Sequence, residues 1–93
     1  METFAELILS HRNDLGMTRV TASKRLNLSY HKLFMLEHGV LRPPEEPERL
    51  RSFCEVYGIP LKRLQLAVEH QKVVKQESKK KLEEKRHGKI VRL

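Results

Sequence analysis

The stretch from Thr18 to Gly39 limits the possible folds of this chain more than any other part of it. It reads TRVTASKRLNLSYHKLFMLEHG. Thr18 is suited to cap the start of a helix, because its hydroxyl can accept a hydrogen bond from a free backbone N–H of the first turn. Ala22 and Leu26 follow at i, i+4 spacing on one helical face. The pattern therefore predicts a short helix that begins just after Thr18.

A second short helix is predicted directly after the first. Asn27 is a good residue on which to leave a helix, because asparagine tolerates the left-handed backbone conformation. Ser29 is a second candidate N-cap, and Leu33 and Leu36 continue the apolar face after it. Two short helices joined by a tight turn form a helix-turn-helix, whose second helix can enter the major groove of DNA.

The flanking sequence predicts three more helices. Thr3 and Glu6 have the spacing of a capping box, and the helix they open should run to about Asp14. Pro47 is suited to the first turn of a fourth helix, and Pro60 to the start of a fifth. The apolar residues at helical spacing in these three helices are predicted to form the core: Phe4, Leu7, Ile8 and Leu15; Leu50, Phe53, Cys54 and Tyr57; Leu61, Leu64, Ala67 and Val68.

This order of residues resembles the helix-turn-helix domain of the phage repressor and Cro class, the lambda-repressor-like or XRE-type family. The resemblance covers residues 3 to 69 and implies an all-α, five-helix DNA-binding domain followed by a basic extension, helical or flexible, at residues 70 to 93. It rests on Arg12, the turn Leu26-Asn27-Leu28-Ser29, Leu33, Leu36, Glu37-His38-Gly39, Pro43 or Pro44, and Tyr57 to Leu61.

The sequence departs from the family pattern at three places. Ala22-Ser23 stands where the family usually has Leu-Ala, and Asn27 stands where the turn usually has glycine. Both changes keep the residues small or compatible with a turn. Arg19 occupies the place of a glutamine that often binds phosphate, and an arginine there can still bind one.

The resemblance also implies which residues contact DNA. In the family, bases are read mainly from the positions held here by Tyr30, His31 and Met35. With their neighbours on the same helical side, the expected base-reading set is Ser29, Tyr30, His31, Phe34, Met35 and His38. The expected phosphate ligands are Thr18, Arg19, Lys32 and Arg42.

Arg12 and Glu37 match a pair that the family commonly forms between the first and third helices. The resemblance implies a partly buried ion pair with a structural role. The alternative is that both are solvated surface charges, which contribute little to stability.

Two functions follow from these residues. The first is a transcriptional regulator that binds double-stranded DNA as a homodimer, reading an inverted repeat with half-sites ~34 Å apart. The alternative is a protein–protein adaptor or assembly subunit, because tyrosine, phenylalanine and methionine also make up protein-binding surfaces. A further possibility for Phe34 is that it packs into the core.

The net charge of +7 is concentrated at the C-terminal end. Residues 1 to 69 hold ten Lys and Arg against nine Asp and Glu, whereas residues 70 to 93 hold nine against three. This composition predicts a basic extension that is helical or solvated. The final KIVRL, residues 89 to 93, is alternatively suited to add a strand to a dimer mate or a protein partner.

Several classes of function are disfavoured. The chain has no nucleophile–base pattern, P-loop or glycine-rich dinucleotide motif, so we expect neither an enzyme nor a cofactor. The histidines lack metal-ligand spacing. Cys54 is the only cysteine, which excludes an intramolecular disulfide. No apolar run is long enough to span a bilayer, so we expect no membrane association. A cytoplasmic, nucleoid-associated protein of a bacterium or phage is expected.

Overall fold

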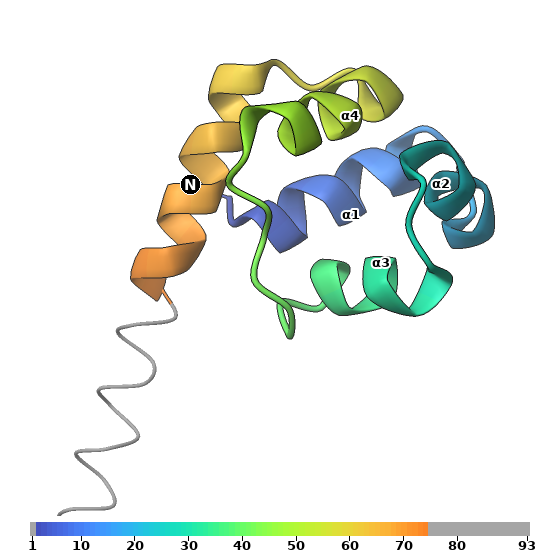
Figure 1. The fold of residues 1–93 in the computed structure, drawn as a ribbon, viewed down its shortest axis with the longest axis horizontal. Helices are drawn as coiled ribbons and strands as arrows, with labels where there is room; N and C mark the ends of the chain where they lie inside the picture. The colour runs from blue at the N-terminus through green and yellow to red at the C-terminus, as the bar shows by residue number, and fades with distance from the viewer. Residues whose placement is uncertain (1, 75–93) are drawn as a thin grey trace, which may run out of the picture.

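The computed structural model describes residues 2–74, which fold into α-helices without a strand (Figure 1). Four helices are α1 (Phe4–Asp14), α2 (Arg19–Leu26), α3 (Tyr30–Glu37) and α4 (Pro47–Tyr57). A further helix, here called the C-terminal helix, covers residues 61–74. The all-helical character expected from the sequence is confirmed for this part of the chain. The proposed strand at residues 89 to 93 and most of the basic extension lie outside the described residues.

The helix ends follow from the local sequence. Thr3 and Glu6 form the predicted capping box at the start of α1. The hydroxyl of Thr18 accepts a hydrogen bond from the Thr21 N–H, and that of Ser29 accepts one from the Lys32 N–H. Asn27 ends α2 with a φ of 56°, the left-handed conformation that its place in the turn requires. These predicted caps are therefore confirmed.

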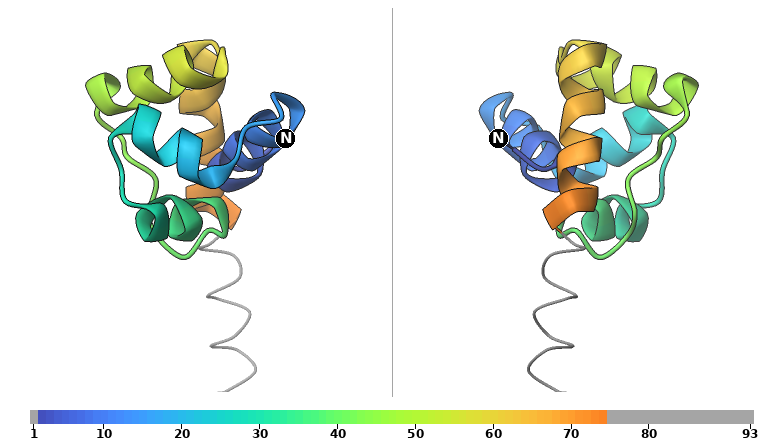
Figure 2. Two further views of the ribbon diagram at one scale, coloured as in Figure 1. Left: turned by 90° about the vertical axis from the view of Figure 1, so that its right-hand side faces the viewer. Right: turned by 90° about the vertical axis from the view of Figure 1, so that its left-hand side faces the viewer.

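The hydrophobic core is formed where the helices meet. Both α1 and α2 contact α3 as well as α4. Figures 1 and 2 show α3 and α4 at opposite ends of the molecule, with α1 between them and the C-terminal helix along one side. The fully buried large side chains are Phe4, Leu7, Ile8, Leu33, Leu50 and Leu64. The short helices therefore depend on shared packing, because isolated helices of this length are marginal in water.

Three expectations about the core need correction. Leu61, at the start of the C-terminal helix, is half-buried and packs against the edge of the core. Leu15 is 54% exposed, because α1 ends at Asp14 and Leu15 is its C-cap, after which the chain turns at Gly16. Cys54 is only half-buried and packs against the edge of the core. Burial still raises the pKa of its thiol.

Gln71 ties the C-terminal helix to the beginning of the chain. Its side chain is buried, and its Oε1 accepts a hydrogen bond of 2.8 Å from the backbone N–H of Ala5. That N–H lies in the first turn of α1, where no intrahelical acceptor exists. No local sequence pattern marks Gln71, and the expected boundary after residue 69 lies inside this helix.

Replacing Gln71 with alanine should lower the free energy of unfolding by about 1–3 kcal/mol, because the buried Ala5 N–H loses its acceptor. Chemical denaturation of the full chain measures the change. Gln65→Ala is the matched control, since Gln65 is exposed on the same helix. Equal losses in the two variants would show that the hydrogen bond does not contribute.

Candidate functional site

The outer face of α3 carries most of the residues that were expected to read bases. Leu33, Leu36 and Glu37 point inward and are buried. Ser29, Tyr30, His31, Phe34 and His38 are exposed, and Met35 is half-buried. The 3.6-residue helical repeat produces this separation, because the inward residues occupy one stripe of the helix. All six expected base readers are therefore at least partly accessible.

Phe34 does not belong to the core, because its side chain is 38% exposed. Its ring lies 4.2 Å from the His38 ring, centroid to centroid. The guanidinium carbon of Arg19 lies 5.1 Å from the Phe34 centroid and 5.5 Å from that of Tyr30. These are cation–π distances. We call Arg19, Tyr30, Phe34 and His38 the aromatic row.

The carboxylate of Glu37 lies beneath this face and joins three helices. Its side chain is fully buried. Its Oε2 accepts a hydrogen bond of 2.6 Å from Arg12 Nε, and its Oε1 accepts bonds from Arg12 Nη2 at 3.2 Å and Arg19 Nε at 2.8 Å. Arg12 comes from α1 and Arg19 from α2. We call Arg12, Arg19 and Glu37 the buried clamp.

Arg19 has a role that the sequence analysis did not assign. Besides its bond to Glu37, its Nη1 donates to the Tyr30 hydroxyl at 3.0 Å. The hydrogen bonds to Glu37 and Tyr30 raise the pKa of Arg19 above its ordinary value. Arg19 therefore connects the buried clamp to the aromatic row, and its expected contact with phosphate stays a prediction.

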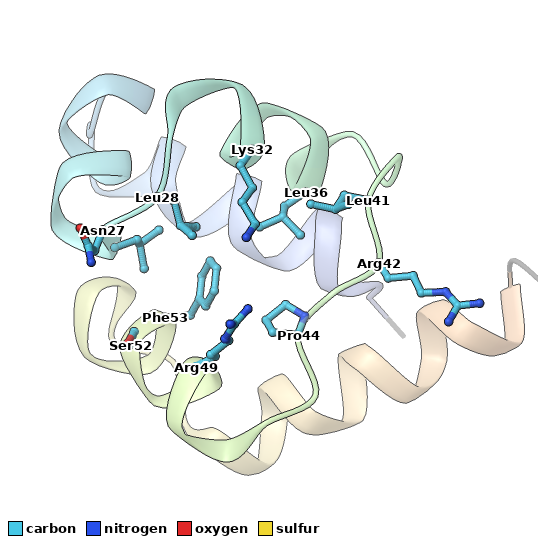
Figure 3. Close-up of a pocket in the computed structure, with 11 residues that line it drawn as sticks. Asn27, Leu28, Lys32, Leu36, Leu41, Arg42, Pro44, Arg49, Ser52 and Phe53 are labelled. Atoms are coloured by element: carbon cyan, nitrogen blue, oxygen red, sulfur yellow. The ribbon is translucent and has the colours of Figure 1, made fainter.

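The expected phosphate ligands lie in two separate places. Thr18 and Arg19 are at the start of α2, where the Thr18 hydroxyl also donates to Thr21 Oγ1 at 3.0 Å. Lys32 and Arg42 are exposed and line a pocket between α3 and α4 (Figure 3). The structure therefore groups these four residues into two pairs.

Tyr57 is a buried polar residue beside the clamp that the sequence analysis treated only as core. Within the described residues, its hydroxyl has no hydrogen-bond partner. Burial raises the pKa of Tyr57 to about 12, and the negative charge of Glu37 adds to the effect. The helical spacing of its apolar ring predicted that Tyr57 is in the core. That its hydroxyl is buried without a partner follows only from the tertiary packing.

Neither a metal centre nor a membrane-spanning helix occurs within residues 2–74. No three His, Cys, Asp or Glu side chains in this range are grouped so as to hold a metal ion. None of its helices is long and apolar enough to cross a bilayer.

Comparisons with protein-family models, curated proteins and solved structures found no match to this chain. The resemblance to lambda-repressor-like domains is therefore an interpretation of the sequence pattern.

Replacing Glu37 with leucine should lower the free energy of unfolding by about 3–5 kcal/mol, because it leaves Arg12 buried without a counter-charge. The double variant Arg12→Met, Glu37→Leu should recover part of this loss. A double-mutant cycle by chemical denaturation measures the coupling.

The exposed pair of Arg63 and Glu2, 3.0 Å apart, is the control for this cycle. Its coupling should be below about 1 kcal/mol, because solvent screens the interaction. Strictly additive losses for Arg12 and Glu37 would contradict a stabilising role for the buried clamp.

Tyr57 should make stability fall at alkaline pH. Its folded-state pKa of about 12 exceeds the ordinary value of 10, so between these values the unfolded chain loses the proton while the folded chain keeps it. The contribution of protonated Tyr57 to the free energy of unfolding is complete below pH 10. It is lost as the pH rises toward 12, by up to about 1.4 kcal/mol per pH unit. Chemical denaturation of Tyr57→Phe and of the unchanged protein across this pH range isolates the effect of Tyr57. Curves of unfolding free energy against pH that run parallel in the two proteins would contradict the prediction.

Proposed function

We propose that this chain is a sequence-specific regulator that binds double-stranded DNA and inserts α3 into the major groove. The observation that carries the proposal is the arrangement of α2 and α3, which are separated by residues 27–29 alone. The buried clamp attaches the inner side of α3 to α1 and α2, and its outer side remains exposed. A rigidly held helix with an accessible face is what readout of base edges requires.

The chemistry of the outer face is compatible with base contacts. The ring nitrogens of His31 can donate to guanine or accept from adenine or cytosine, depending on the tautomer. Phe34 and Met35 are suited to pack against thymine methyl groups. The Tyr30 hydroxyl accepts a hydrogen bond from Arg19 and retains its own hydrogen to donate to a base or phosphate.

We further propose that the protein acts as a two-fold dimer on an inverted repeat with half-sites ~34 Å apart. Exposed apolar residues on the C-terminal helix support this proposal. Leu66 and Val73 are 50% and 52% exposed, and Val74 is 37% exposed. Their i, i+7 and i+8 spacing places them on one side of the helix, which is suited to pack against a second copy.

The second candidate function is that of a protein adaptor, and the aromatic row favours it. Tyr30 and Phe34 are both substantially exposed, and Arg19 contacts both rings. Tyrosine and arginine are frequent among the residues that dominate protein-binding energy. The nearly balanced charge of residues 1 to 69 also weakens any general attraction of this domain to DNA.

Selection from a pool of random duplexes tests the first candidate against the second. Enrichment of an inverted repeat supports the DNA-binding regulator. A folded protein that enriches no sequence contradicts it and leaves the adaptor as the better explanation. Both candidate functions use the aromatic row, so variants in this row do not distinguish them. The enrichment of a sequence by the selection does.

If α3 reads bases, His31→Ala should weaken binding to the selected site by about 1–3 kcal/mol and relax the preference at one base pair. Affinity for random duplex should change much less. His70→Ala is the matched control, because His70 lies on the C-terminal helix. Equal losses on selected and random DNA would remove His31 from the base-reading set.

Removal of residues 75–93 should reduce electrostatic attraction without changing sequence preference. These residues hold eight Lys and Arg against three Glu. The truncated protein retains Gln71 and should bind more weakly at low salt, with a shallower slope of log affinity against log salt, because fewer counterions are released. A lower mass by light scattering would instead assign this segment to dimer or partner contacts. Unchanged slope, affinity and mass would contradict both roles.

A further inference from the structure

A pocket that is open to solvent on one side lies between α3 and α4. It is bounded by both helices, by the turn before α3 and by the segment that follows α3 (Figure 3). Its volume is about 540 Å³. Sites for small organic ligands commonly span roughly 300–1,000 Å³. The pocket is therefore large enough for a compact organic molecule.

The floor of the pocket is apolar. Leu36 and Phe53 form its buried part, with 2% and 3% of their surfaces exposed. Leu28 and Leu41 are half-buried beside them. Because Leu36 and Phe53 expose almost no surface, an apolar group placed here would chiefly remove hydrocarbon surface of Leu28 and Leu41 from water, which is favourable in proportion to the area covered.

The rim of the pocket is cationic. Figure 3 shows the side chains of Lys32 on α3 and Arg49 on α4 pointing toward one another across the floor, with Arg42 at the outer edge. No carboxylate belongs to the described lining. Arg49 is paired with Glu46, whose Oε2 lies 3.0 Å from Arg49 Nε with both side chains more than 60% exposed. Such an exposed pair contributes little energy, so Glu46 is a weak competitor for another anion at Arg49.

We propose that this pocket binds a small organic acid with a flat apolar body and a single carboxylate. The body covers the half-buried Leu28, and the carboxylate lies between Lys32 and Arg49. The anion pairs with both cations, and the arginine offers paired donors to a carboxylate. A phosphodiester supplies the charge alone and leaves the floor exposed to water. This proposal does not depend on DNA binding, because the site and its test involve no nucleic acid.

The probe is 2-naphthoate, with the uncharged 2-naphthamide as its near-isosteric control. Titration of the full chain by calorimetry should give saturable naphthoate binding with a Kd on the order of 1 mM or tighter. Backbone amide NMR shifts should be concentrated at Leu28, Leu41 and Phe53. The amide should bind at least tenfold more weakly, because it lacks the charge that the rim attracts.

Two charge-removing variants locate the site. Arg49→Gln and Lys32→Gln should each weaken naphthoate binding roughly threefold to tenfold. Arg51→Gln is the matched control, because Arg51 is exposed on the same helix but does not line the pocket. It should leave the affinity unchanged. Circular dichroism confirms that each variant is folded.

Four results would overturn the proposal. Absence of saturable binding is the first, and equal binding of naphthoate and naphthamide is the second. Equal weakening by Arg51→Gln and Arg49→Gln would show diffuse attraction to a basic protein. Displacement of naphthoate by an equimolar amount of inorganic phosphate would show a simple anion site in which the apolar floor has no role.

Discussion

The arrangement of the helices depends on the ion pairs that the buried carboxylate of Glu37 forms. This carboxylate accepts hydrogen bonds from Arg12 on α1 and Arg19 on α2, so one side chain of α3 attaches that helix to both neighbours. A helix of eight residues has little stability of its own. The orientation of α3 is therefore a tertiary property, set by the clamp and by the packing of Leu33 and Leu36.

Arg19 contacts residues on both the inner and the outer side of α3. Its Nε bonds the buried carboxylate, while its guanidinium covers the exposed rings of Tyr30 and Phe34. Residues that contact a ligand directly are most effective when other residues restrict their conformations. The candidate binding face is thus held by the same group that stabilises the domain, whether its partner is DNA or a protein.

Lys32 relates the two proposed sites. It stands on the same short helix as the outer-face residues, yet it faces α4 across the pocket (Figure 3). An organic anion held between Lys32 and Arg49 would neutralise positive charge close to the proposed DNA interface. Because electrostatic attraction to phosphate depends on such charges, occupation of the pocket would be expected to weaken DNA binding.

The sequence by itself determined the local structure. Thr18 and Ser29 cap their helices, Asn27 takes the left-handed turn and Pro47 opens α4, because these preferences depend on neighbouring backbone groups alone. The pairing of Arg12 with Glu37 followed only from a family resemblance. Tertiary structure decided the contacts between distant residues. Gln71 reaches Ala5 across 66 positions, and Lys32 and Arg49 line one pocket, because such arrangements depend on how the helices pack and not on any local pattern.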